Sequence, residues 1–290
     1  MVHVPGSPTC ISHFPEFLIN MKSISILLAI APLFTPLGAQ ILSIKGSDTL
    51  GAKLIPQLAE SFKAAGNTDV KFEIAAEGSS TAFPALANGT AQLGMSSRKI
   101  KDEERTECQT KGVELTEYPI CHDMLCVIVN KNSPLSKLTK EQVAKIFTGQ
   151  IKDWSEIGGA PGKISIYTRN TSSGTYKDWQ SLAMGGRDYP PSSLKMAGTE
   201  QIAQEVAKNK NGIGYVGLAY SKTVGTKSLV IDGVAPVGKN AKTYAFARLC
   251  YLYSTATPSP EATAFLKFIE TEPGQEIIRK VGFIANKDLE

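Results

Sequence analysis

Several features that direct an interpretation toward enzymes, nucleic acid or membranes are scarce in this sequence. The 290 residues contain only three histidines, and neither a C-x-x-C pair nor a G-x-S-x-G motif occurs among them. The formal net charge of +4 is spread along the chain, without a block of lysine or arginine. We therefore do not expect nucleic acid or an anionic membrane as the main partner. The content of 42% hydrophobic and 20% charged residues is typical of a globular protein.

Long hydrophobic runs are also missing, because the most apolar run, residues 24–34, is too short to span a membrane as a helix. It follows Met21-Lys22-Ser23 and precedes the c-region-like segment 35–39, a pattern typical of a secretory signal peptide. We expect export to the periplasm with cleavage after Ala39, and an uncleaved anchor is the alternative. Residues 1–20 are interpreted as an upstream start-site extension. Because Gln40 rather than a cysteine follows the cleavage point, we expect a soluble protein and not a lipoprotein.

The mature chain is poor in cysteine and histidine. Cleavage removes Cys10 and leaves four cysteines, which are Cys108, Cys121, Cys126 and Cys250. An even number in an oxidising compartment predicts one or two disulfides, with the pairing left open. A metal site is not expected, because His122 is the only histidine left and the cysteines lack the spacing of a metal motif. We expect no cofactor either.

Strand-like and helix-like patterns alternate along the mature chain. Strands are predicted at 41–44, 70–74, 93–95, 124–129, 164–167, 213–216 and 249–253. Helices are predicted at 50–62 with Gly66 as the stop, after the 77–81 turn as far as 86, and at 102–110, 138–147, 176–182, 201–208, 260–269 and 274–281. This order predicts an α/β architecture with a mostly parallel sheet that is covered by helices on both faces.

Hydroxyl-bearing residues gather in three of the strand-to-helix turns, which are Ser47-Asp48-Thr49, Ser79-Ser80-Thr81 and Ser172-Ser173-Gly174-Thr175. The amides at the positive end of a helix bind anions, although serine and threonine are also the preferred N-caps of any helix. Three such turns, with Arg98 and Arg169 beside two serine clusters, favour an anion site over capping alone. Turns at the carboxyl ends of parallel strands converge on one crevice, and an arginine fork matches a tetrahedral anion.

Several longer segments are similar to a known family. The segments 138–142 and 146–151, with Asp153-Trp154 and Gly158-Gly159, resemble the signature of phosphate-binding proteins of ABC-type phosphate uptake systems. The segment 169–175 is similar to the phosphate-binding turn of that family, and 211–215 to another of its recurring segments. The resemblance covers roughly residues 44–284.

The resemblance implies the type II periplasmic binding-protein fold, an α/β fold of two lobes joined by two crossing strands near 121–123 and 248–249. Each lobe would hold a central, mostly parallel sheet flanked by helices. We expect lobe 1 to comprise residues 40–121 and, on the return of the chain, 249–290, while lobe 2 comprises 122–248. The implied function is capture of inorganic phosphate by hinge closure and delivery to the transmembrane subunits of an ABC transporter. The protein is then a binding protein, not an enzyme, and we expect a monomer.

Carried over to this chain, the ligand contacts of the family fall on residues from all three turns. They are Thr49, the Leu50 amide, Ser79, Ser97, Arg169, Ser173, Gly174 and Thr175, with Ser47, Asp48, Ser80 and Arg98 as additional candidates.

One position departs from the family, because Ser97 stands where other members have an aspartate that accepts the proton of hydrogen phosphate. Asp48 is one candidate for that acceptor, and a first-turn carboxylate that favours the helix dipole is its other interpretation. Arg98 either adds positive charge to the site or is a surface arginine paired with Asp102.

Other functions compete with phosphate transport. A serine hydrolase or phosphatase would need a base for its nucleophile, and only His122 is left in the mature chain. A phosphate-loop NTPase does not fit either, because the segment 158–163 lacks the glycine spacing and Ile164 stands where serine or threonine is needed. The same fold could instead bind sulfate, molybdate or tungstate, or serve as a phosphate-responsive sensor or an adhesin.

Overall fold

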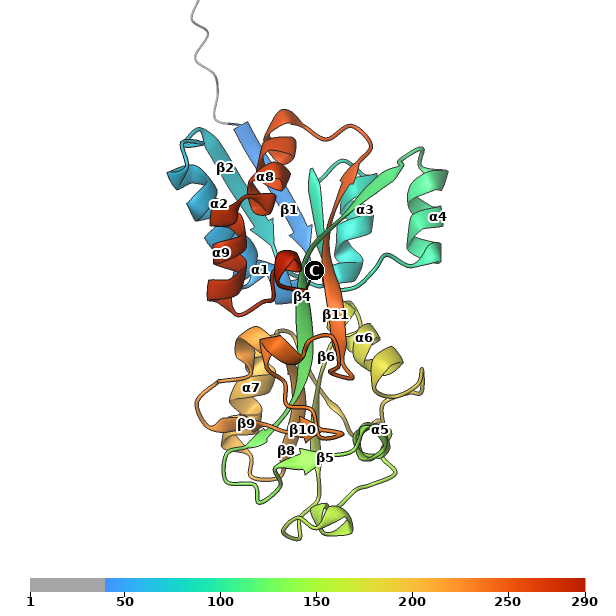
Figure 1. Ribbon diagram of the computed structural model, residues 1–290. Helices are drawn as coiled ribbons and strands as arrows, with labels where there is room; N and C mark the ends of the chain where they lie inside the picture. Colours follow the sequence, from blue (N-terminus) through green and yellow to red (C-terminus); the bar gives the residue numbers. More distant parts are fainter. Residues whose placement is uncertain (1–39, 290) are drawn as a thin grey trace, which may run out of the picture. The chain divides into compact units, whose positions relative to one another are not determined.

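The computed structural model describes residues 40–289 (Figure 1). Residues 1–39, on which the predicted signal peptide and upstream extension fall, lie outside the described residues, as does Glu290. The strands are β1 Gln40–Gly46, β2 Val70–Ala75, β3 Leu93–Ser96, β4 Leu115–Asn130, β5 Lys137–Leu138, β6 Ser165–Arg169, β7 Leu194–Met196, β8 Gly212–Gly217, β9 Thr226–Ser228, β10 Val230–Ile231 and β11 Ala247–Thr255. The helices are α1 Asp48–Gly51, α2 Leu54–Ala64, α3 Ala82–Ala87, α4 Asp102–Thr110, α5 Lys140–Phe147, α6 Gly174–Leu182, α7 Thr199–Lys208, α8 Pro260–Glu270 and α9 Glu272–Val281. Short 3-10 helices lie at Ser79–Thr81, Trp154–Ile157, Leu218–Tyr220, Gly238–Asn240 and Asn286–Asp288.

A sheet of nine strands organises the fold, in the order β2-β1-β3-β11-β4-β8-β6-β7, with β9 added to β4. β1 runs parallel to β2 and β3 at one end of this order, and β6 runs parallel to β7 and β8 at the other. The long strands β4 and β11 are antiparallel to each other and pass from one group to the other (Figure 1). The predicted α/β architecture is confirmed, as two lobes of mostly parallel strands flanked by helices.

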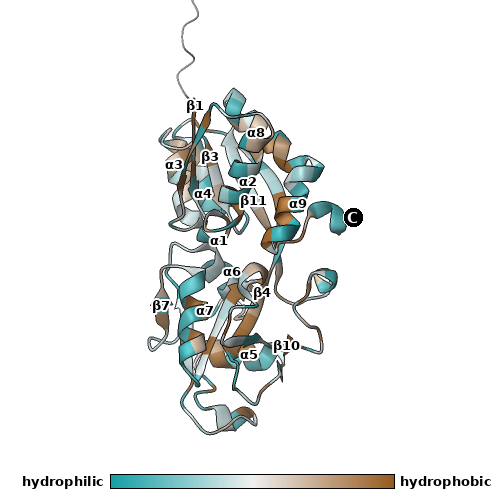
Figure 2. Ribbon diagram, turned by 90° about the vertical axis from the view of Figure 1, so that its left-hand side faces the viewer, coloured by the Kyte–Doolittle hydropathy of each residue, from teal (hydrophilic) through white to brown (hydrophobic). Residues whose placement is uncertain are grey.

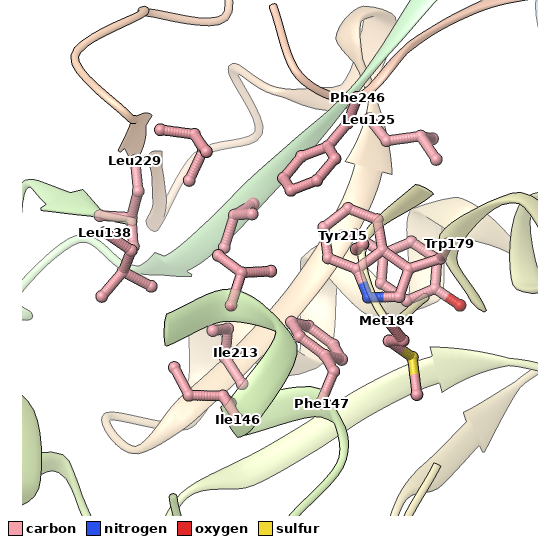
Figure 3. Close-up of a cluster of buried hydrophobic side chains, with 14 of the residues drawn as sticks. Leu125, Leu138, Ile146, Phe147, Trp179, Met184, Ile213, Tyr215, Leu229 and Phe246 are labelled. Carbon is pink, nitrogen blue, oxygen red and sulfur yellow. The ribbon is translucent and has the colours of Figure 1, made fainter. Parts of the chain in front are cut away.

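Each lobe has its own hydrophobic core. In the lobe of β1, β2 and β3, the helices α2 and α8 meet the sheet through Phe62 and Phe265, whose ring centroids lie 5.5 Å apart. The other lobe is centred on Phe147, Trp179 and Tyr215 (Figure 3). The Trp179 and Tyr215 rings stack with centroids 4.4 Å apart. Figure 2 shows the apolar stretch of β4 within the lower lobe, where teal helix surfaces face outward.

Two local features differ from the sequence prediction. The helix predicted at 50–62 is interrupted between α1 and α2, where Lys53 has φ −135°. Gly51 packs so closely on β3 that an added Cβ would lie 2.5 Å from Met95 Cε. The strand predicted at 124–129 is part of the sixteen-residue β4. Its first half was missed because Thr116 is exposed and Glu117 is partly exposed, so that the apolar pattern is broken there.

The predicted crossing points lie where β4 and β11 pair. The register places Arg248 opposite Asp123 and Cys250 opposite Cys121, and it shifts by one residue immediately after Cys250. The four cysteines of the described residues, Cys108, Cys121, Cys126 and Cys250, are buried free thiols in this structure. The one or two disulfides that the cysteine count predicts are therefore not formed in this structure.

Candidate anion-binding site

Four buried hydroxyls from different parts of the chain meet between the lobes. Thr49 Oγ1 lies 2.9 Å from Thr175 Oγ1, and Ser79 Oγ lies 3.3 Å from Ser97 Oγ. The two pairs are joined by a contact of 3.4 Å between Ser97 Oγ and Thr175 Oγ1. Each of the four residues is at most 1% exposed. The structure therefore brings together the three turns and Ser97, as the sequence predicted.

The first turn of α6 shows why glycine and serine stand side by side there. A Cβ added at Gly174 would lie 2.8 Å from Ser97 Oγ and would also collide with Ser79, so only glycine permits this approach between the lobes. Ser173 caps α6, because its Oγ accepts from the Tyr176 amide at 3.3 Å. Leu50 is fully buried in α1, where first-turn amides have no partner within the helix.

Arg169 is a buried cation at the end of β6, with 1% of its side chain exposed. Its Nη1 donates to Asp48 Oδ2 and to Thr199 Oγ1, both at 2.8 Å, and its Nη2 donates to the Ala197 carbonyl at 2.7 Å. Its Nε is buried and has no hydrogen-bond partner within residues 40–289. Burial lowers the pKa of Arg169, and the Asp48 carboxylate partly opposes this shift.

Asp48 joins the two lobes through a single carboxylate oxygen. Besides the Arg169 bond, Asp48 Oδ2 accepts from the backbone amide and from the hydroxyl of Thr199, both at 3.0 Å. Thr199 belongs to α7, so Asp48 at the start of α1 holds both a strand end and a helix start of the other lobe. This bridging role was not considered from the sequence, which offered only a proton acceptor or a helix-dipole partner. The signal was weak, because nothing near Thr199 marks it in sequence.

Arg98 lies beside the site and is already paired. Its Nη2 and Nη1 donate to the two carboxylate oxygens of Glu104 at 2.6 and 2.8 Å, and Nη2 also donates to Ser80 Oγ at 3.2 Å. The alternative prediction, a surface arginine paired with Asp102, was therefore wrong, because Arg98 pairs with Glu104 and its side chain is buried. Ser47 is also buried and packs at the turn, where its amide donates to Met95 O at 2.8 Å.

Arg248 is another residue whose role at the site the sequence analysis missed. It lies on β11, and its Nη1 donates to Thr175 Oγ1 at 3.1 Å and to Asp178 Oδ2 at 3.0 Å. Its Nε and Nη2 donate to Oδ2 of the fully buried Asp123 on β4, at 3.2 and 2.8 Å. Asp123 Oδ1 in turn accepts from the Leu218 amide at 2.9 Å. A guanidinium on one crossing strand thus links the other crossing strand to the third turn.

The charges of this network are strongly perturbed. Burial opposes the charge of Arg248, but the Asp123 carboxylate, with Asp178, outweighs this effect and raises the pKa of Arg248. Burial also raises the pKa of Asp178, although Arg248 lowers it in part. Since Arg248 is a fixed donor to Thr175, the Thr175 hydroxyl has its own proton free for another acceptor.

Neither a catalytic base nor a metal cluster accompanies these hydroxyls in the described part of the chain. The His122 side chain lines a shallow hollow of about 380 Å³ with Lys242 and Leu289, and burial lowers the pKa of His122. Within residues 40–289, no group of three or more histidine, cysteine, aspartate or glutamate side chains is placed to hold a metal ion.

Comparison with known proteins decides the family. The model of the PBP superfamily domain matches residues 35–272. The phosphate-binding protein PstS of Pseudomonas aeruginosa is 35% identical over 268 residues, which cover 84% of this chain and 82% of the relative. The PstS of Staphylococcus saprophyticus is 31% identical over 83% of this chain and 78% of its own length. The chain belongs to the PstS family.

Solved structures of PstS-like proteins agree with this assignment. A phosphate ABC transporter substrate-binding protein with bound phosphate from Clostridium perfringens matches with a TM-score of 0.78 and 30% identity. The alignment covers 85% of this chain and 99% of that protein. An ABC-type phosphate transport receptor from Vibrio cholerae matches with a TM-score of 0.70 and 25% identity, over 84% and 99% of the two chains. The PstS-family chain therefore has the type II periplasmic binding-protein fold that the sequence predicted.

Proposed function

We propose that this PstS-family chain captures inorganic phosphate between its two lobes and delivers it to the transmembrane subunits of an ABC transporter. The observation that carries the proposal is the meeting of Thr49 and Thr175, 126 residues apart in the sequence, at 2.9 Å. Hydroxyls and helix-start amides from both lobes then face one point. A tetrahedral anion with several acceptor oxygens suits such a set of donors better than a planar or apolar ligand does.

Each candidate residue has a role in the proposed complex. The hydroxyls of Thr49, Ser79 and Thr175 donate to the anion, as do the amides of Leu50, Gly174 and Thr175. Arg169 supplies the positive charge, and its buried, unpaired Nε is a donor that an anion would satisfy. Ser173 keeps α6 capped, so that the amide end of the helix stays directed at the ligand.

Phosphate and sulfate differ by a proton, so selectivity needs an acceptor. Asp48 Oδ2 already accepts three hydrogen bonds, and for that reason we favour Ser97 Oγ over Asp48 for this role. The Ser97 hydroxyl can donate to Ser79 or Thr175 while its lone pairs receive the phosphate proton. Ser47, Ser80 and Arg98 are placed around the anion and not on it.

Arg248 acts in this proposal as a positioning residue. It holds the Thr175 hydroxyl as a donor and connects it to Asp123 on the opposite crossing strand. We place the hinge at this contact, with lobe 1 formed by 40–121 and 249–290 and lobe 2 by 122–248. Because Arg248 and Asp123 lie on the two crossing strands at the lobe boundary, movement of these strands and orientation of Thr175 are coupled.

The family and the signal-peptide pattern of residues 21–39 support a proposed cellular role. We propose that the signal peptide beginning near Met21 directs the chain to the periplasm and is removed after Ala39, and that the mature protein is a monomer without enzymatic activity. No helix in the described range, residues 40–289, is long and apolar enough to cross a membrane. The disposition of the serines without a base in contact supports binding over hydrolysis.

Calorimetry on protein stripped of bound ligand tests the proposal. The protein is titrated with phosphate, sulfate and molybdate in turn, under one buffer and pH. We expect saturable one-to-one binding of phosphate, with sulfate and molybdate at least tenfold weaker. Tighter binding of another oxyanion would reassign the ligand within the same fold, and no binding of any of them would favour a sensor or adhesin.

A further inference from the structure

The two crossing strands carry a pair of cysteines that the phosphate site does not use. Cys121 on β4 lies directly opposite Cys250 on β11 in the antiparallel register, and both are fully buried. Directly opposite residues of an antiparallel pair have Cα atoms about 4.5–5.5 Å apart, which falls within the range that a disulfide requires. Both are free thiols in this structure and belong to the same buried cluster.

The other two cysteines are held elsewhere. Cys126 faces a different core around Ile128 and Ile202, and its strand neighbour is Val216. Cys108 lies on α4 in a third core, where its Sγ donates to the Phe83 carbonyl at 3.7 Å. Of the four, only Cys121 and Cys250 share one hydrophobic cluster. The pairing that the sequence left open is thereby reduced to one arrangement.

The local backbone favours a bond at this position. The register of β4 and β11 shifts between Cys250 and Tyr251, so the ladder is irregular immediately beside the cysteine pair. Such a bulge lets the strands adjust their separation and twist without disturbing the pairing on either side. The bond would close a loop of about 130 residues that contains the whole of the lobe built on β6, β7 and β8. Because a cross-link restricts the unfolded chain more when the closed loop is longer, such a bond should stabilise the fold.

We propose that Cys121 and Cys250 form a disulfide across the hinge when the chain folds in an oxidising compartment, which rests on the export proposed above. Two Sγ–H bonds break and one Sγ–Sγ bond forms. A glutathione or protein disulfide takes up the two electrons and two protons and is released as two thiols. In the folded dithiol, burial raises the pKa of Cys121, and its contact with Cys250 raises it further. Thiolate is scarce there, so the bond forms while the strands are still accessible.

Peptide mapping identifies the bond without depending on export or on phosphate. The full chain is refolded from denaturant in a glutathione redox buffer, and remaining thiols are alkylated under denaturing, non-reducing conditions. Digestion with trypsin and with a protease that cleaves before aspartate separates Cys121, in peptide 112–122, from Cys126, in peptide 123–131. We expect peptide 112–122 linked to peptide 249–267, with a mass two hydrogens below the sum. Alkylation of both Cys121 and Cys250, or a linkage of either one to Cys10, Cys108 or Cys126, would overturn the proposal.

Thermal unfolding with and without reductant provides the matched control. We expect reductant to lower the Tm of the refolded wild type and of Cys126→Ala by about 5–15 °C, from the loop length and the size of the protein. The same treatment should leave Cys250→Ala unchanged, because that variant cannot form the bond. Because each protein is compared with itself, with and without reductant, the effect of the substitution on packing cancels in the difference in Tm. A Tm that responds to reductant equally in Cys250→Ala and Cys126→Ala would contradict the assignment.

Discussion

Asp48 and Arg169 form an ion pair across the candidate site, with 2.8 Å between Asp48 Oδ2 and Arg169 Nη1. The two side chains are 15% and 1% exposed, so water and salt screen the pair poorly. Asp48 begins a helix of one lobe and Arg169 ends a strand of the other. Arg169, the cation that we assign to phosphate binding, therefore also forms an ion pair with the opposite lobe.

Removing Arg169 should abolish most of the anion affinity. In Arg169→Ala the buried anion loses a charge-assisted partner, which costs about 2–5 kcal/mol, or roughly 30- to several-thousand-fold in Kd. Calorimetry with phosphate measures the change, and the exposed Arg187→Ala is the control for loss of one positive charge. Binding by Arg169→Ala within threefold of the wild type would show that the site is misplaced.

Neutralising Asp48 should weaken phosphate and sulfate together. Because Asp48 Oδ2 bridges Arg169 and Thr199 of the other lobe, Asp48→Asn loosens the closed arrangement whichever anion is bound. We expect the binding free energy of both anions to weaken by about 1–3 kcal/mol, with the ratio of their Kd values preserved within threefold. Weaker phosphate binding with unchanged or tighter sulfate binding would instead identify Asp48 as the acceptor of the phosphate proton.

The Ser97 hydroxyl should decide the discrimination between these anions. In Ser97→Ala the phosphate proton loses its acceptor, so phosphate binding should weaken by about 1–3 kcal/mol and sulfate binding by less. Ser97→Asp restores the carboxylate expected from the family resemblance and should raise the ratio of phosphate to sulfate affinity. Equal losses for both anions in Ser97→Ala would mean that the hydroxyl acts as a donor only.

The pH dependence of stability should carry a contribution from Asp178. Burial raises the pKa of this carboxyl in the folded protein, so the folded state binds more protons than the unfolded state in the pH range just above the ordinary aspartate value. Stability from this group therefore falls as pH rises from about 4 through the raised value.

Comparison of Asp178→Asn with the wild type isolates this contribution. The free energy of unfolding is measured by denaturant at several pH values, and the wild type should lose stability relative to Asp178→Asn as pH rises over that range. Shared groups such as His122 cancel in the difference. Parallel curves for the two proteins would contradict a raised pKa at Asp178.

The sequence predicted the elements of the fold well, for a physical reason. Apolar periodicity depends on which residues face a core, so β2 and α8, which each bury one face, were predicted close to their bounds. The break between α1 and α2 at Lys53 and the close approach of Gly51 to the Met95 side chain of β3 are features that no local apolar pattern encodes. The short strands β5, β7, β9 and β10 were missed because two or three residues show no period.

The candidate site was predictable to the extent that it consists of local turns. Each turn is recognisable in the sequence by serine, threonine or glycine after a predicted strand. Parallel strands bring such turns to the same edge of the sheet. The residues that support the turns are not local. Thr199 and Asp48 lie in different lobes, and Arg248 and Thr175 are 73 residues apart in the sequence, so both contacts depend on tertiary distances.

Small-angle scattering of the ligand-free and phosphate-saturated protein tests most directly whether phosphate is held between the lobes. Donors from both lobes can meet one anion only when the hinge closes, so the radius of gyration should decrease when phosphate is added. Sulfate at a concentration too low to bind serves as the control for ionic strength, and calorimetry on the same samples confirms saturation. An unchanged radius of gyration at confirmed saturation would contradict capture between two closing lobes.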